Sequence, residues 1–278
     1  METFTPTLLV VFRETLEAGL MVGIVLTVLA RLAALRYRSH VLSSALAAVL
    51  LSFGLAFILQ YTTKDLKGIL EKCLEGGISI LACGVLTHMI FWMDRQAQRI
   101  RPEIEDKVRE AVVRQEYWAI VSIPFLAVLR EGAETVLFLQ AVAIQHSQAV
   151  SWIGGILGAG GALAVSWLIF IGGKKLPIRT FFRTTGIFLL LVAAGLLAYG
   201  IHEFQELGFL PFLEKTAWNT NPLLNEKEGV GAFLKSLLGY NGNPSILEVI
   251  VYSAYLLVVG FFLKSLPAAR PRETPVSR

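Results

Sequence analysis

Residues 11–20 of the chain read Val-Phe-Arg-Glu-Thr-Leu-Glu-Ala-Gly-Leu, and residues 128–137 read Val-Leu-Arg-Glu-Gly-Ala-Glu-Thr-Val-Leu. Each stretch places an arginine and two glutamates inside an apolar run long enough to cross a bilayer. Ionisable side chains are costly in the hydrocarbon core and are usually functional there. We call the two stretches the Arg-Glu motifs, and their repetition in one chain indicates a shared functional site.

Helical spacing brings the charged side chains of each motif onto one face. The arginine lies four residues and the first glutamate three residues before the second glutamate. Two such helices facing each other present four carboxylates and two guanidiniums, a set whose oxygen donors suit hard multivalent cations. The sequence therefore predicts a metal-cation site with the ligands Glu14, Glu17, Glu131 and Glu134, and with Arg13 and Arg130 as orienting counter-charges.

Two other interpretations of the motifs deserve comparison. Salt bridges that merely let the helices tolerate their charges would need one glutamate for each arginine, and each motif carries a surplus carboxylate. Di-iron enzymes use a Glu-x-x-His pattern, and here a second glutamate stands where the histidine would be. An ion site in a membrane transporter, not an enzyme, is therefore the better prediction, with an intramembrane carboxylate-bridged redox enzyme as the weaker alternative.

The composition is that of a polytopic, all-α membrane protein. Of 278 residues, 55% are hydrophobic and only 17% charged, and the mean hydropathy is +0.62. The net charge of +4 comes from lysines and arginines in short loops beside apolar spans, which is typical of membrane topology and gives no reason to expect nucleic acid. The N-terminal residues lack the basic start of a cleaved signal peptide. The two cysteines, Cys73 and Cys83, have neither metal-type nor redox-type spacing.

Seven membrane-spanning helices are expected, at about residues 6–30, 41–60, 74–93, 118–145, 150–171, 184–203 and 246–265. Seventeen lysines and arginines, Lys264 included, fall on one side of these spans and six on the other, so the N-terminus is predicted outside and the C-terminus in the cytoplasm. Five aromatic residues are expected at the two membrane boundaries: Trp92, Tyr117 and Trp118 inside, and Tyr61 and Trp152 outside.

This topology makes the two motif helices antiparallel. The chain is then a single permease domain with two inverted three-helix repeats, at about residues 1–93 and 118–203. An outer loop of about residues 204–245, a seventh helix of about residues 246–265 and a cytoplasmic tail of residues 266–278 follow. Residues 94–117 are expected to form a cytoplasmic amphipathic or solvated helix.

Further polar residues cluster at the predicted outer ends of the spans, where they would concentrate cations at an outer opening. We expect a pathway role for Glu75, His202, Glu203, Glu206, Glu248 and Tyr252, although solvated caps and hydrogen-bonded interface residues are the alternatives. His88 is expected to be buried and neutral, and His40 and His146 to lie in loops or at boundaries.

The paired Arg-Glu-x-x-Glu motifs in a seven-span frame resemble the high-affinity iron permease family, also called oxidase-dependent iron transporters. Further similarity to its bacterial branch is seen at Leu74-Glu75-Gly76, Phe91-Trp92-Met93, Ala193-Ala194-Gly195-Leu196, Leu238-Gly239-Tyr240, Pro244-Ser245 and Glu248. The resemblance covers most of the chain.

This resemblance implies uptake of iron, as Fe²⁺ or Fe³⁺, across the cytoplasmic membrane, with the four motif glutamates as translocation ligands. It implies no permanently bound cofactor, because iron is the transported substrate. It also implies extracytoplasmic partners, such as an oxidase, a cupredoxin-like protein or a haem peroxidase. A permease for another divalent cation such as manganese remains the alternative within the same class.

Overall fold

The computed structural model describes residues 3–64, 68–96, 100–146, 150–172, 178–226 and 229–265. All of its regular elements are helical, apart from one isolated bridge between Thr216 and Ser245. The elements are α1 (Phe4–Arg31), η1 (Leu35–Tyr37), α2 (Arg38–Lys64), α3 (Ile69–Gln96), α4 (Ile100–Val113), α5 (Tyr117–His146), α6 (Trp152–Gly172), α7 (Ile178–Glu206), α8 (Gly229–Leu238) and α9 (Ile246–Ser265).

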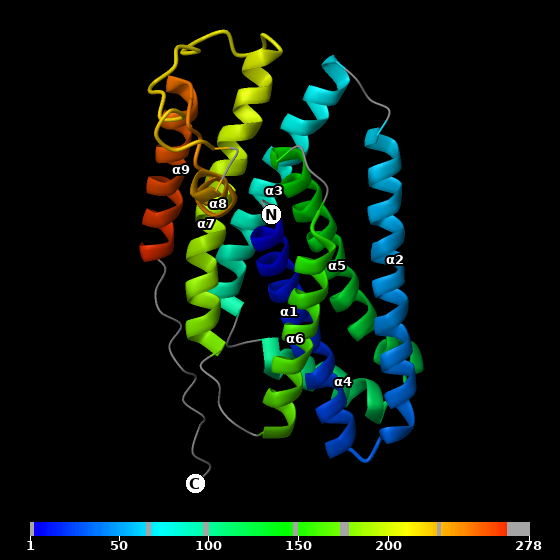
Figure 1. The fold of residues 1–278 in the computed structure, drawn as a ribbon. Helices are drawn as coiled ribbons and strands as arrows, with labels where there is room; N and C mark the ends of the chain where they lie inside the picture. The colour runs from blue at the N-terminus through cyan, green and yellow to red at the C-terminus, as the bar shows by residue number, and fades with distance from the viewer. Residues whose placement is uncertain are drawn as a thin grey trace.

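Seven of the helices in the described residues have 20 residues or more, and they lie side by side in one bundle (Figure 1). Followed by colour in Figure 1, α1, α3, α6 and α9 run toward the lower end, and α2, α5 and α7 run toward the upper end. The motif helices α1 and α5 are therefore antiparallel. The short helix α4 lies at the lower end, and α8 belongs to the excursion between α7 and α9.

Five of these helices contain segments long and apolar enough to cross a membrane: Leu35–Thr62, Ile69–Phe91, Trp152–Phe170, Gly186–Glu206 and Ile246–Ser265. The remaining long helices, α1 and α5, have 28 and 30 residues. Each carries the three charges of an Arg-Glu motif near its middle, which lowers its hydropathy. The all-α class of a polytopic membrane protein is confirmed at this level. The sequence and the structure agree on the positions of all seven long helices.

Each motif helix packs most extensively against a helix from the other half of the chain. Helix α1 packs most extensively against α6, and α5 packs most extensively against α2. Helices α3 and α7 pack against each other, and α1 also contacts α5 directly. Helix α9 lies against α7 at the edge of the bundle. The two motifs are thereby held at the centre of the molecule.

Large apolar side chains on the outer helices are left exposed. Phe57 on α2, Ile156 on α6 and Leu257 on α9 have about 70% of their surface free, at 70%, 69% and 73%. Such surfaces are unstable in water and are normal against lipid. The aromatic residues Trp118 and Trp152 are also exposed, at 79% and 76%, as the prediction of boundary positions requires.

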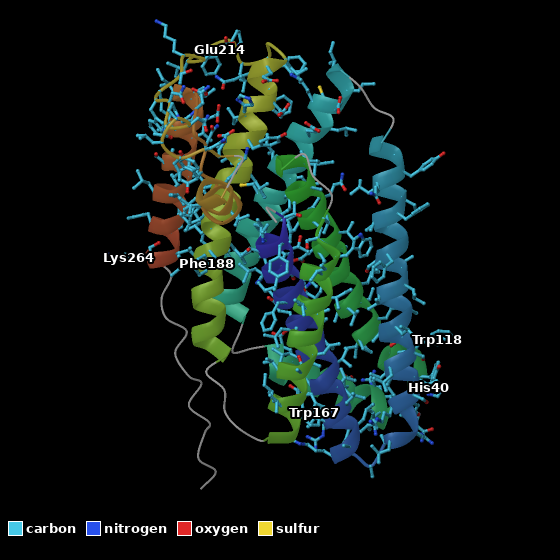
Figure 2. The ribbon with its side chains drawn as sticks, in the orientation of Figure 1. His40, Trp118, Trp167, Phe188, Glu214 and Lys264 are labelled. Atoms are coloured by element: carbon cyan, nitrogen blue, oxygen red, sulfur yellow. The ribbon has the colours of Figure 1, made fainter. Side chains whose placement is uncertain are left out.

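The lower end of the bundle is closed by an apolar cluster. Val25 and Leu29 of α1 meet Val108 of α4 and Ile120 of α5, and each is at most 1% exposed. Helix α4 turns this apolar face inward and leaves its charged residues outside, as expected for residues 94–117. Figure 2 shows His40 and Trp118 at the same end, where the ring of Tyr117 packs edge-on against His40 at 5.1 Å.

One prediction about a single side chain was wrong. His88 is exposed on α3, whereas the adjacent Met89 is 4% exposed and faces the bundle. The helical period decides this, because burying residue 89 turns residue 88 by about 100° away from the core. The predictions for the side chains of Trp92 and His146 and for the tail 266–278 lie outside the described residues.

Candidate metal centre

The first motif lies in the middle of α1 and is almost wholly buried. Arg13 is 1% exposed, Glu14 2% and Glu17 7%. One guanidinium nitrogen of Arg13, Nη1, donates to Oε1 of Glu14 at 2.8 Å, and Nη2 lies 2.8 Å from Oε1 of Glu17. The arginine thus bridges both carboxylates of its own motif, as the helical spacing predicts.

The second motif, on α5, is less completely buried than the first. Glu131 is 1% exposed, whereas the side chain of Arg130 is 43% exposed and that of Glu134 18%. Arg130 pairs with Oε1 of Glu131 through Nη2 and through Nε, the latter at 3.0 Å. Its Nε lies 3.7 Å from Oε1 of Glu134. Each arginine therefore forms ion pairs with both glutamates of its own motif.

Three of the four motif glutamates converge. Glu14 from α1 and Glu131 and Glu134 from α5 each offer one carboxylate oxygen, and these oxygens lie within 4.8 Å of one another. We call these three residues the carboxylate triad. One buried oxygen of each, Oε2 in every case, has no hydrogen-bond partner. Buried carboxylate oxygens without donors are costly, and a divalent cation supplies the charge that they lack.

Glu17 stands apart from this triad. It lies one turn beyond Glu14 on α1, toward the lower end of the bundle, and its Oε1 faces Arg13. The sequence predicted four equivalent ligands, and the structure brings three of them together in one cluster with the fourth beside it.

Small residues allow the motif helices to approach their neighbours. A Cβ atom at Gly132, between the glutamates of the second motif, would lie 2.7 Å from Cβ of Ser52 on α2. A Cβ at Gly19, two residues after Glu17, would lie 2.6 Å from Oγ of Ser166 on α6. Contacts this short exclude any side chain larger than hydrogen, so these glycines permit the close helix packing common in membrane bundles.

The candidate pathway residues form two polar groups at the upper end. In the first group, the hydroxyl of Tyr199 donates to Oε2 of Glu75 at 3.4 Å, and Glu203 is 6% exposed on the same helix as Tyr199. Lys72 pairs with Glu206. Helices α3 and α7 are therefore joined at this end by contacts between oppositely charged and hydrogen-bonding side chains.

The second group is centred on Glu248, which is 2% exposed. Its Oε1 lies 2.9 Å from Nδ1 of His202 and accepts the backbone N–H of Ser245 at 3.1 Å, and its Oε2 accepts Nδ2 of Asn241 at 2.7 Å. His202 also lies 3.2 Å from Glu206 through Nε2. Glu248 therefore ties α7, the excursion before α9 and α9 itself together.

Tyr252 contributes to the same attachment, because its hydroxyl donates to the carbonyl of Leu238 at the end of α8 at 2.7 Å. A cavity of about 290 Å³ lies among α7, α8 and α9. Its polar lining is formed by Tyr199, His202, Asn221, Glu226, Lys235, Tyr240, Asn241, Asn243 and Glu248. The candidate residues His202 and Glu248 thus border a polar cavity, and Tyr252 fixes one of its walls.

Sequence reasoning missed two residues of these networks. Met89 accepts a hydrogen bond from Arg13, and Asn241 binds Glu248. A methionine in an apolar helix gives no sequence signal that separates it from core packing. Asn241 belongs to an Asn-Gly-Asn-Pro run that is typical of a turn, and its contact depends on how that turn folds back on α9.

Residues 5–269 match the iron permease FTR1 family. The chain belongs to that family. A ferrous iron permease EfeU of Yersinia pseudotuberculosis serotype I (strain IP32953) is 34% identical over 265 residues, which cover 94% of this permease and 93% of the relative. The ferrous iron permease EfeU of Escherichia coli O6:H1 (strain CFT073) is 33% identical over 259 residues, covering 92% and 94%. No solved structure matches the permease.

Family membership agrees with the geometry. The protein is a transporter and not an enzyme. It is a multi-pass membrane protein, and its similarity to bacterial ferrous iron permeases is consistent with a location in the cytoplasmic membrane. The resemblance inferred from the two Arg-Glu motifs is confirmed.

Proposed function

We propose that this permease imports iron, taken as Fe²⁺, across the cytoplasmic membrane, with the carboxylate triad as its central binding site. The observation that carries the proposal is the convergence of three buried carboxylates from two antiparallel helices, each with an oxygen that lacks a hydrogen-bond partner. The relatives named ferrous iron permeases support the choice of ion and of its oxidation state.

In this mechanism the arginines fix the carboxylates in place and limit their mutual repulsion until the cation arrives. Two unit positive charges already lie among the four glutamates, so a divalent ion at the triad competes with the guanidiniums for the same carboxylate groups. Arg130 is the half-exposed partner and moves at lower cost than the buried Arg13. We infer that Glu17, one turn further along α1, becomes the fourth ligand as the ion moves toward the lower end.

We further propose that the two halves are inverted repeats, α1 to α3 and α5 to α7. A two-fold exchange of the halves would swap the α1–α6 contact with the α5–α2 contact and keep the α1–α5 and α3–α7 contacts, and all four contacts are present. Inverted repeats commonly form a binding site at their interface. The upper end would then face outward, and the apolar cluster around Val108 would close the cytoplasmic end.

On this orientation the polar groups at the upper end lie before the triad on the path of the ion. Glu75, Glu203 and Glu206 would raise the local cation concentration. His202 and Glu248 would border the outer cavity, and Tyr252 would anchor the end of α8 beside it. Any oxidation or reduction of iron is assigned to separate extracytoplasmic proteins, an oxidase, a cupredoxin-like protein or a peroxidase. Iron itself is the substrate and no permanent cofactor is proposed.

Uptake into proteoliposomes tests the central proposal. Purified permease should accumulate Fe²⁺ supplied with a reductant, and Glu14→Gln or Glu134→Gln should lower the initial rate by at least about tenfold, because each removes one charged ligand of the ion. Glu71→Gln, at an exposed site on α3, is the matched control and should transport normally.

Two comparisons decide between ions. Fe³⁺ replaces Fe²⁺ in one series, with and without a proton gradient, and excess Mn²⁺ competes with Fe²⁺ in another. Normal Fe²⁺ uptake by the properly inserted Glu14→Gln protein would overturn the triad as the site. Accumulation of Mn²⁺ in preference to Fe²⁺ would overturn iron as the substrate.

A further inference from the structure

Met89 brings a sulfur atom to the edge of the carboxylate triad. It lies on α3, a helix that carries neither Arg-Glu motif, and it is 4% exposed. Nη1 of Arg13 donates to Sδ of Met89 at 2.8 Å. The side chain is fixed by an apolar cluster that includes Leu86 and Ile90 of α3 and Phe138 of α5. The side chain of Met89 therefore lies in the apolar interior of the bundle, with its sulfur against Arg13.

The sulfur is close to the triad because both contacts share one nitrogen. Nη1 of Arg13 also donates to Oε1 of Glu14 at 2.8 Å, so the sulfur and that carboxylate oxygen cannot be further apart than twice this distance. An ion bound through the Glu14 carboxylate would thus lie within a short side-chain movement of the thioether. Methionine has three rotatable bonds, which makes such a movement inexpensive.

The Glu14 carboxylate and the Met89 thioether are coupled, because both contact Nη1 of Arg13. A cation bound by the Glu14 carboxylate repels the guanidinium, and this repulsion favours the departure of Nη1 from Oε1 of Glu14. Because the same nitrogen covers the sulfur of Met89, its departure frees both donors together. The ion thereby meets three carboxylates and a thioether at one step.

A site made of three carboxylates and one thioether would bind divalent ions of different softness with different affinity. Carboxylate oxygens suit hard ions such as Mg²⁺ and Mn²⁺, whereas thioether sulfur suits softer ions. Leucine would fill nearly the same volume as methionine at this position and offer no donor. A methionine therefore adds selectivity that packing alone does not require.

We propose that Met89 is a specificity-determining residue of the permease and that its thioether makes the carboxylate triad favour Fe²⁺ over harder divalent ions such as Mn²⁺. This inference rests on the proposed function, since it needs the triad to bind the transported ion. It adds a donor from a third helix, α3, to the two motif helices.

The test compares Met89→Leu with wild type and with Met21→Leu, a matched change at a half-buried methionine of α1. Fe²⁺ uptake into proteoliposomes is measured against a range of Mn²⁺ concentrations. In Met89→Leu the KM for Fe²⁺ should rise roughly three- to tenfold while the inhibition constant of Mn²⁺ stays unchanged, the size expected from losing one weak donor. Met21→Leu should behave as wild type.

Two further measurements distinguish the loss of a sulfur donor from a general loss of packing at residue 89. Met89→Gln, which offers a hard oxygen on a similar stem, should shift the preference toward Mn²⁺. X-ray absorption spectra of Fe²⁺-loaded permease should contain a sulfur neighbour of iron that is lost in Met89→Leu. Equal losses for both ions in Met89→Leu, or unchanged selectivity together with no sulfur neighbour in wild type, would overturn the proposal.

Failure of this inference differs from failure of the proposed function. If wild-type protein transports Fe²⁺ and Glu14→Gln does not, but Met89→Leu keeps the wild-type ratio of Fe²⁺ to Mn²⁺, the triad stands and the thioether has no role. If Glu14→Gln transports like wild type, the triad itself is wrong, whatever the Met89 variants do.

Discussion

Two arginines with the same place in their motifs have different surroundings. Arg13 is 1% exposed and contacts Glu14, Glu17 and Met89, whereas the side chain of Arg130 is 43% exposed and pairs within its own helix. Removing one partner of a buried ion pair is strongly destabilising because the remaining charges stay uncompensated. Arg130 is only partly buried, and one of its two partners, Glu134, is also partly exposed, so its loss leaves less buried charge uncompensated.

We therefore predict that Arg13→Gln and Arg130→Gln differ in stability. Arg13→Gln should cost about 3–5 kcal/mol, because Glu14 and Glu17 would be left buried without a positive charge. Arg130→Gln should cost less, about 1–3 kcal/mol, because Arg130 pairs with one fully buried carboxylate, Glu131, and one partly buried carboxylate, Glu134. Thermal unfolding of the detergent-purified proteins measures the difference, and equal melting temperatures for the two variants would contradict it.

Residue types and spacing were sufficient to predict that the charged side chains of each motif share one face of their helix, because helical geometry fixes which side chains of one helix lie together. The sequence could not predict that Glu17 stands beside the triad or that Met89 contacts Arg13. Both depend on the rotation and depth of one helix relative to another, which no spacing within a single helix determines. The wrong prediction for His88 has the same cause.

At the scale of the helices, close packing of α5 on α2 holds the second motif in position. Gly132 lies between Glu131 and Glu134, and a Cβ there would come within 2.7 Å of Cβ of Ser52. The backbone of α5 would have to move away from α2, and the triad would move with it. Gly84 on α3 is a helical glycine whose Cβ would meet no atom within 4 Å.

Gly132→Ala should therefore destabilise the protein by about 1–3 kcal/mol, the usual cost of overpacking, and should lower Fe²⁺ uptake. Gly84→Ala adds the same methyl group where there is space and should be neutral or slightly stabilising, because alanine favours a helix. Melting temperature and initial uptake rate are measured on both variants. A stable, fully active Gly132→Ala protein would show that this contact is not tight.

The positions of the long helices were predictable from hydropathy and charge, since each overlaps an expected span, but α3 and α7 begin at Ile69 and Ile178, before the expected starts at about 74 and 184. The apolar face of α4 was less accessible to sequence reasoning. Its buried residues Val108 and Ala111 are separated by exposed charges, and only the lower ends of α1 and α5 give that face a partner.

For the molecule as a whole, the distribution of lysine and arginine predicts which end is cytoplasmic. The excursion after α7 lies at the upper end, where Figure 2 labels Glu214, and α4 lies at the lower end. If the charge rule holds, the upper end faces outward. The two ends differ, because the cavity bordered by His202 and Glu248 lies toward the upper end and the apolar cluster around Val108 lies at the lower end.

Single cysteines in a background without Cys73 and Cys83 test this orientation. Asn219→Cys, in the excursion after α7, should react with a membrane-impermeant maleimide in intact spheroplasts. Lys107→Cys, exposed on α4, should react only after the membrane is permeabilised. Both substitutions are at exposed positions, so the protein should fold normally, and the reverse labelling pattern would invert the proposed direction of transport.

The carboxylate of Glu248 joins His202, at the end of α7 and 46 residues away, to Asn241 of the preceding turn and to Ser245 at the start of its own helix. The segment between α7 and α9 is thus attached to both of these helices. A movement of this segment would therefore move the upper ends of α7 and α9 with it, because Glu248 is bonded to residues of all three.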